Sequence, residues 1–132
     1  MHRIATLAGD DPTEEIILVE QPSAPILFLS SATSDIATLS LTLKQIQNSK
    51  WVDQIRALPL GTINHPAQID HYIHTTCRQA KLIIIRLLGD ISYWSYGLEQ
   101  LEIWKNSSEE RYLVVLSGTS ENSKELNNIS NI

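Results

Sequence analysis

The chain has 132 residues, 42% of them hydrophobic and 19% charged, which is typical of one globular domain and excludes an intrinsically disordered chain. It carries 10 lysines and arginines against 15 aspartates and glutamates, a net charge of −5, so we expect no nucleic-acid partner, because the phosphate backbone requires a basic surface. The single cysteine, Cys77, excludes an intramolecular disulfide and indicates a reducing, cytoplasmic setting.

Membrane insertion and export are not expected from the apolar stretches of the sequence. The longest of them, residues 82–88, is interrupted by Arg86 and is far shorter than the ~20 residues that a membrane-spanning helix requires. Near the amino terminus, Asp10 and Asp11 arrive before an apolar region of signal-peptide length has formed. We therefore predict a protein without a membrane span or an export signal.

The first two predicted strands are short apolar runs at residues 16–19 and 26–29. Residues 22–25 between them begin and end with proline, and the connection is too short for a crossover helix. The two strands are therefore predicted to be antiparallel or not to be neighbours. The second run is continuously apolar, as expected for a strand that is covered on both faces.

Segments with helical period alternate with the remaining predicted strands. In chain order we expect a helix over 33–46, a strand over 54–58, a helix that opens at Asn64-His65-Pro66, a strand over 81–87, a helix over 92–105 and a strand over 112–116. Ser34 or Asp35 is available to cap the first helix. The alternation predicts an α/β fold with three αβα layers around a mainly parallel open sheet of four or five strands, flavodoxin-like or Rossmann-like.

Residues 1–118 are predicted to form this α/β domain, and residues 119–132 a polar tail. The tail is rich in serine and asparagine, but Leu126, Ile129 and Ile132 repeat every third residue. This spacing predicts the start of an amphipathic helix that is cut short at residue 132, without a C-cap glycine.

The five glycines form none of the common nucleotide or nucleophile motifs. None is followed by Lys-Ser or Lys-Thr, and together they form neither G-x-G-x-x-G nor G-x-S-x-G. We therefore expect no P-loop ATPase, dinucleotide-dependent dehydrogenase or serine hydrolase. We predict no catalytic residue in this chain and no cofactor bound to it.

The most distinctive stretch, residues 86–99, runs from the carboxyl end of a predicted central strand into a helix. Open α/β sheets bind ligands at that edge. Tyr93, Trp94 and Tyr96 could stack on a flat conjugated ring, and Arg86 could meet the carboxylate or amide groups on it. These four are our candidate ligand-binding residues. In the alternative interpretation Trp94 packs beneath the helix and Arg86 pairs with a structural carboxylate.

A weaker candidate is a metal site on the helix that begins at residue 66. His71, His74 and Cys77 follow one another at intervals of three residues and could converge on a soft or borderline metal. The spacing drifts around the helix and lacks the C-x-x-C or H-E-x-x-H geometry. The alternative is two solvated histidines and a small buried thiol.

Two further polar clusters have both a functional and a structural interpretation. Four carboxylates between residues 10 and 15 could attract a hard cation, but a hydrated surface explains them more simply. Hydroxyl-bearing residues between 30 and 35 follow a strand end and could face a ligand, but helix capping explains them as well.

Four segments, taken in order, resemble a known family. They are Met1-His2-Arg3-Ile4-Ala5, Val19-Glu20-Gln21, Ala24-Pro25-Ile26-Leu27-Phe28-Leu29, and Arg86-Leu87-Leu88-Gly89 followed by Ser92-Tyr93-Trp94 and Tyr96-Gly97-Leu98-Glu99. Together they resemble the N-terminal region of the large, CobN-type subunit of cobaltochelatases, which is related to the large subunit of magnesium chelatase. The last segment is the most specific of the four.

The resemblance implies a subunit that holds hydrogenobyrinic acid a,c-diamide and cobalt, while separate AAA+ subunits hydrolyse ATP on the route to cobalamin. It also implies that the remainder of the large subunit is a partner, and that the 132 residues insert no metal by themselves. The chain departs from the family at Asp90-Ile91, where a glycine and a basic residue are common, and at Ser95, where proline is frequent. The missing glycine puts a close approach of the backbone to a ligand in doubt.

Two other functions are compatible with the sequence alone. A freestanding, non-enzymatic α/β interaction or scaffold module would have the same acidic composition and the same lack of catalytic motifs. A small metal or corrinoid carrier would use His71, His74 and Cys77, or the aromatic residues between 93 and 96. Copurification from the native host tests the first, and titration with cobalt, zinc and a corrinoid tests the second.

Overall fold

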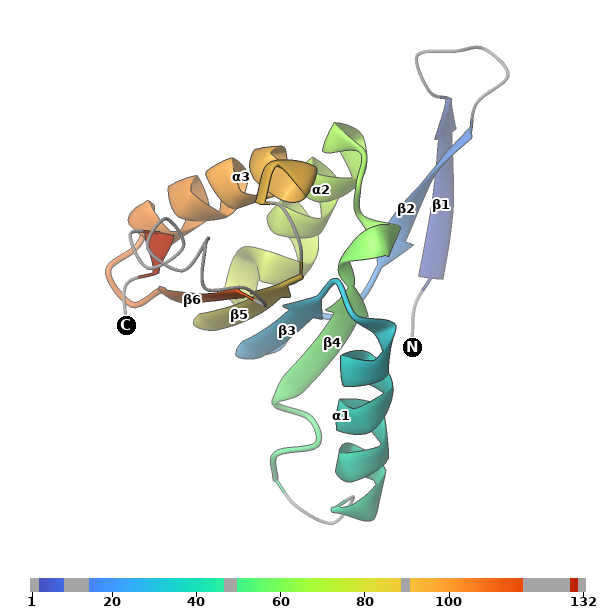
Figure 1. The fold of residues 1–132 in the computed structure, drawn as a ribbon, viewed down its shortest axis with the longest axis vertical. Helices are drawn as coiled ribbons and strands as arrows, with labels where there is room; N and C mark the ends of the chain where they lie inside the picture. The colour runs from blue at the N-terminus through green and yellow to red at the C-terminus, as the bar shows by residue number, and fades with distance from the viewer. Residues whose placement is uncertain (1–2, 9–14, 47–49, 89–90, 118–128, 131–132) are drawn as a thin grey trace.

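The computed structural model of the chain describes residues 3–8, 15–46, 50–88, 91–117 and 129–130 (Figure 1). They form a two-stranded hairpin and a four-stranded sheet with helices on both faces. The elements are, in chain order, β1 (Arg3–Ala8), β2 (Glu15–Glu20), β3 (Ile26–Ser30), α1 (Thr33–Gln45), β4 (Ile55–Pro59), the 3-10 turn η1 (Leu60–Thr62), α2 (Pro66–Thr75), the 3-10 turn η2 (Thr76–Gln79), β5 (Leu82–Leu87), the 3-10 turn η3 (Ile91–Trp94), α3 (Ser95–Asn106) and β6 (Tyr112–Ser117).

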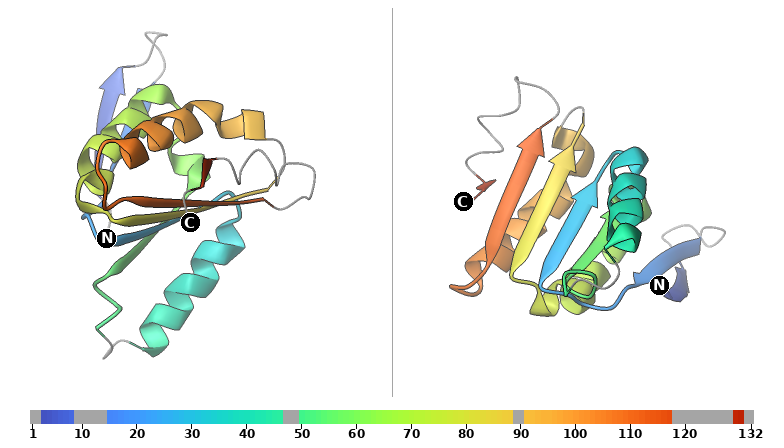
Figure 2. Two further views of the ribbon diagram at one scale, coloured as in Figure 1. Left: turned by 90° about the vertical axis from the view of Figure 1, so that its left-hand side faces the viewer. Right: turned by 90° about the horizontal axis from the view of Figure 1, so that it is seen from below.

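The four strands of the main sheet are all parallel and stand in the order β4-β3-β5-β6. The chain passes from β3 through α1 to β4, and then through α2 to β5 on the other side of β3. Helices α2 and α3 lie on one face of the sheet and α1 lies on the other (Figures 1 and 2). The predicted three-layer α/β fold with a parallel sheet is confirmed, and its strand order is that of flavodoxin-like folds.

The strands β1 and β2 form a separate antiparallel hairpin, with Arg3 opposite Glu20. The strand β2 was predicted from the sequence. The short connection from β2 to β3 also correctly predicted that these two strands are either antiparallel or not neighbours, since they lie in different sheets. The strand β1 was not predicted, because residues 3–8 hold few β-branched residues and become a strand by pairing with β2. The Gln68 side chain on α2 donates a hydrogen bond to the carbonyl of Ile17, which ties the hairpin to the main body.

The core lies between the sheet and the helix pair α2 and α3. Every second residue of the central strands points into it and is fully buried, as are the apolar sides of both helices. Its members include Leu27, Leu29, Ile83, Ile85, Leu113, Ile69, Tyr72, Trp94, Leu98, Leu101 and Trp104. Among the described residues no helix combines the length and the apolar character that crossing a membrane requires.

The other face of the sheet is covered by α1 over β3 and β4, and no residue of α1 is buried. Over β5 and β6 this face stays exposed, with 46% of Leu116 and 47% of Tyr112 accessible to solvent. Figure 2, right, shows both strands (yellow and orange) beside α1 with no described helix in front of them. We call this surface the open face; its residues are Phe28, Leu82, Ile84, Tyr112, Val114 and Leu116.

The capping of one helix and the start of another differ from the prediction. The N-cap of α1 is Ala32, without a side-chain cap, because Asp35 is engaged with Arg86 and with the Ser30 hydroxyl instead. The third helix begins at Ser95 rather than near residue 92, because Trp94 turns its ring into the core with a non-helical backbone (φ −133°, ψ 34°). By contrast, His65 caps α2 as part of a capping box, directly before Pro66.

Most of the predicted tail, residues 119–132, lies outside the described residues. Of the described pair, Ile129 packs against the core and its carbonyl accepts a hydrogen bond from Lys105 of α3, at 2.7 Å. The Ser130 hydroxyl accepts a hydrogen bond from the backbone N–H of Val115 in β6, at 2.8 Å. These two residues therefore lie at the edge of β6 and against α3.

Candidate functional site

The carboxyl ends of β3 and β5 form the topological switch point of the sheet, because the chain leaves β3 toward β4 on one side and β5 lies on the other. Doubly wound sheets bind ligands at this position. Here the buried Ser30 donates to Asp35 at 2.8 Å and accepts from the N–H of Ala32 at 3.0 Å. The Ser31 hydroxyl accepts from the N–H of Leu88 at 2.8 Å. Hydrogen bonds within the protein thus connect the end of β3 to the start of α1 and to the residue that follows β5.

Arg86 lies at the end of β5 on the α1 side and forms an ion pair with Asp35 of α1. The side chains of Arg86 and Asp35 keep 40% and 24% of their surfaces exposed, so the pair borders solvent. The hydrogen bond from Arg86, then that from Ser30, holds the pKa of Asp35 below its ordinary value against the opposing effect of burial. Asp35 is therefore the structural carboxylate with which Arg86 was expected to pair in the alternative interpretation.

The ion pair makes stability depend on pH. Because the pKa of Asp35 is lowered by folding, its contribution is present above its ordinary value of 3.8 and is lost as the pH falls through the lowered value. We expect Asp35→Asn to unfold at lower urea concentration than the parent at neutral pH, and the difference to shrink at acid pH. Urea titrations at about pH 7 and about pH 3 measure this; an equal difference at both would contradict the assignment.

Trp94 is a core residue. Its ring is 3% exposed, and its indole N–H donates to the carbonyl of Ile63, next to η1, at 3.0 Å. Gly97, one turn later in α3, lies directly against this ring: a Cβ added there would lie 2.4 Å from the nearest ring atom. Trp94 and Gly97 together thus fix how α3 packs on the segment between β4 and α2.

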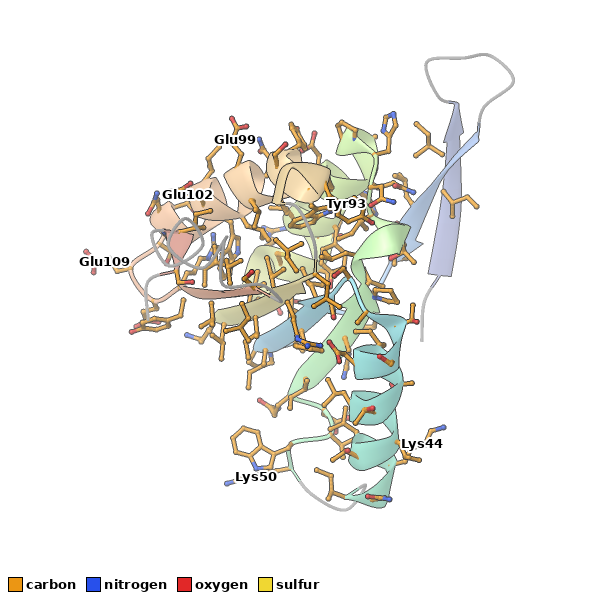
Figure 3. All side chains as sticks on the ribbon, in the orientation of Figure 1. Lys44, Lys50, Tyr93, Glu99, Glu102 and Glu109 are labelled. Atoms are coloured by element: carbon orange, nitrogen blue, oxygen red, sulfur yellow. The ribbon has the colours of Figure 1, made fainter. Side chains whose placement is uncertain are left out.

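Tyr93 and Tyr96 connect the start of α3 to the α2 region. Tyr93, which is labelled in Figure 3, is 54% exposed. Its hydroxyl lies 3.4 Å from Oδ1 of Asn64. Tyr96 is half-buried and donates to Oδ1 of Asp70 at 2.8 Å, which is the main cause of its raised pKa. Arg86 lies on the opposite face of the sheet, so the structure does not bring all four candidate ligand-binding residues together.

The three candidate metal ligands have separate surroundings. The ring of His71 lies 2.8 Å from a carboxylate oxygen of Glu20, and His74 is exposed. Cys77 is fully buried, and burial raises the pKa of its thiol. In the described part of the chain, no three His, Cys, Asp or Glu side chains are placed to hold one ion. The carboxylates between residues 10 and 15, for which a hydrated surface was the simpler interpretation, have no described side chain.

A groove of about 460 Å³ lies between α2, α3 and the start of β6. Its clearest feature is Arg111, whose guanidinium stacks 5.0 Å from the centre of the Trp104 ring. The same guanidinium donates to the carbonyls of Trp104 and Arg78 at 3.0 and 3.2 Å. Arg111 therefore closes the turn between α3 and β6 and fixes the end of η2.

Sequence reasoning did not single out Arg78, Trp104 and Arg111 as members of one groove. Arg78 follows α2, and Arg111 precedes β6, which lie far apart in the sequence and gave no shared motif. The available signal was the alternation of helices and strands, which predicts a parallel sheet. Because β5 and β6 are parallel, the residues that precede them, including Arg78 and Arg111, lie at the same edge of the sheet. Placing the two arginines beside one another required the direction of each strand and not a local pattern.

Comparison with known proteins finds two relatives of this chain. It is 35% identical over 103 residues to the aerobic cobaltochelatase subunit CobN of Sinorhizobium sp., and 32% identical over 102 residues to that of Pseudomonas aeruginosa. Each match covers 76% of this chain but 8% of the relative. No family model and no solved structure matches the chain. The resemblance noted in the sequence is confirmed: the chain is related to a segment of CobN.

Proposed function

We propose that this chain is the N-terminal α/β domain of the large subunit of a cytoplasmic CobN-type cobaltochelatase and that it contributes structure rather than a catalytic group. The observation that carries the proposal is the match to two CobN subunits over 76% of the chain. The complete subunit would hold cobalt and hydrogenobyrinic acid a,c-diamide as substrates, and AAA+ partner subunits would hydrolyse the ATP. The remainder of the large subunit is then the principal partner of this domain.

A structural role agrees with the contacts of the most specific segment, residues 86–99. Trp94 and Gly97 are in contact within the core, and Arg86 is paired with Asp35. Each of these residues joins two elements: α3 to the segment after β4, and β5 to α1. The segment would therefore be retained in a chelatase subunit because it assembles the domain.

Tyr93 is the candidate ligand-binding residue whose ring remains accessible, at 54% exposure. If it contacts the corrin in the complete subunit, Tyr93→Ala should raise the KM for the corrin, while Tyr93→Phe, which retains the ring, should leave it close to the parent value. Steady-state cobalt insertion with varied corrin measures both. Equal KM values for parent and Tyr93→Ala would remove Tyr93 from the proposed site.

Copurification from the native host tests the proposal against the freestanding-module alternative. Antibodies against this chain should recover a polypeptide of large-subunit size that contains its tryptic peptides, together with AAA+ subunits. Recovery of a polypeptide of about 14.8 kDa bound to a separate, complete large subunit would instead identify a freestanding interaction module.

A further inference from the structure

The open face is an apolar surface on a type of sheet that is ordinarily covered on both sides. All-parallel sheets occur almost exclusively with helices on both faces. Here α2 and α3 cover one face, while the described residues place α1 alone on the other. We infer that the open face is the docking site of an amphipathic helix supplied by the rest of the large subunit, an inference that rests on the proposed function.

The dimensions of helices and strands indicate how much of this face is uncovered. Neighbouring strands are about 4.8 Å apart and a helix is about 10 Å wide, so one helix covers about two strands. Four strands therefore need two helices on each face. Since α1 contacts β3 and β4, the second helix on its side belongs over β5 and β6.

One side of α1 forms a wall of this docking site. A groove of about 320 Å³ runs beside α1, lined by Asp35, Thr38, Leu39 and Thr42 of the helix and by Phe28 of β3. Helices pack side by side at 8–10 Å, and such a groove is what a neighbouring helix fills. From Phe28 the apolar surface continues across Ile84 and Val114. The occupant therefore meets Leu39 on one side and the open face below.

The rest of the large subunit is the favoured source of this helix. The matched segment is 8% of each CobN relative, so these relatives have extensive polypeptide outside it. Within this chain, the described residues beyond β6 lie elsewhere: Ile129 contacts the core and its carbonyl binds Lys105 of α3, on the opposite face. The hairpin β1–β2 is likewise held against α2 through Gln68.

Cysteine labelling tests the inference with a matched pair of positions. Leu116 on the open face and Ile17 on the hairpin are 46% and 45% exposed, and both lie in strands. Leu116→Cys and Ile17→Cys are made in the 132-residue chain and in a chimera in which the chain replaces the matching segment of Pseudomonas aeruginosa CobN. A maleimide is the probe, and mass spectrometry of the peptides gives each rate. The buried Cys77 should stay unlabelled in all four proteins, which reports that the domain is folded.

We expect equal labelling rates in the 132-residue chain and, in the chimera, labelling of Leu116→Cys slowed by at least about tenfold relative to Ile17→Cys. Equal rates in a chimera that inserts cobalt would overturn the inference and leave the proposed function standing. Concentration-dependent protection of Leu116→Cys in the 132-residue chain would also overturn it, because the occupant would be a second copy. A folded chimera that inserts no cobalt would overturn both.

Discussion

Replacing Trp94 with alanine is expected to lower the free energy of unfolding by about 3–5 kcal/mol, the usual cost of truncating a buried aromatic ring. The ring is 3% exposed and packs between α3 and the segment before α2, so its loss leaves a cavity in the core. It also leaves the carbonyl of Ile63 without its indole donor, which adds an unsatisfied polar group to the cost. Urea unfolding followed by circular dichroism measures the change.

The matched control is Trp51→Ala, which removes the same side chain at a position that is 49% exposed. We expect a loss of about 1 kcal/mol or less for this variant, as is usual for surface substitutions. If Trp94→Ala unfolded at the same urea concentration as Trp51→Ala, the packing role of Trp94 would be wrong. Ligand binding would then be the favoured interpretation of Trp94.

Replacing Gly97 with alanine is expected to destabilise the fold by about 1–3 kcal/mol through overpacking, although alanine is the better helix former. The added Cβ would lie 2.4–2.5 Å from three atoms of the Trp94 ring, a separation that real contacts do not show. The ring is enclosed by the core and cannot move away cheaply. Either the indole must shift or α3 must lift from the sheet.

Combining Gly97→Ala with Trp94→Leu separates overpacking against the Trp94 ring from other causes of destabilisation. In a Trp94→Leu background the large ring is gone, so Gly97→Ala should cost much less than it does in the parent, and the two effects should not add. Urea titrations of the parent, both single variants and the double variant give the coupling energy. Strict additivity would show that Gly97 is required for a reason other than its contact with Trp94.

Much of the sheet could be predicted from the sequence because buried parallel strands have a strong local signal. Residues 82–87 form an apolar run of strand length, and the surrounding segments have helical period. The order of the strands, β4-β3-β5-β6, depends on which strand each crossover returns to, and the sequence did not specify it. The hairpin partner β1 was missed for the same reason, since pairing with β2 is a tertiary effect.

The candidate site was predictable in part. The sequence located residues 86–99 correctly at the carboxyl end of a central strand, and it offered packing of Trp94 and pairing of Arg86 as alternatives to ligand binding. It could not identify Asp35 as the partner, because 51 residues separate Asp35 from Arg86 in the chain. Nor could it show that Gly97 lies against the Trp94 ring, since that contact depends on the 3-10 turn before α3.

The open face illustrates a different limit. Its residues read as ordinary buried-strand positions, because β5 and β6 are apolar on both sides. From sequence alone, both faces of these strands would be taken as core. Only the arrangement of the helices shows that Leu116 and Tyr112 remain exposed in this chain. The exposure is therefore a property of the fold and not of the local pattern.

Cobalt insertion by the chimeric subunit is the most direct test of membership in a chelatase. Pseudomonas aeruginosa CobN lacking the matching segment, the same protein with this chain in its place, and the unaltered subunit are assayed with their AAA+ partners, ATP, cobalt and the corrin. We predict that the deletion abolishes cobalt insertion and that the chimera restores it. A chimera that is folded, with Cys77 protected, but is as inactive as the deletion variant would contradict the assignment.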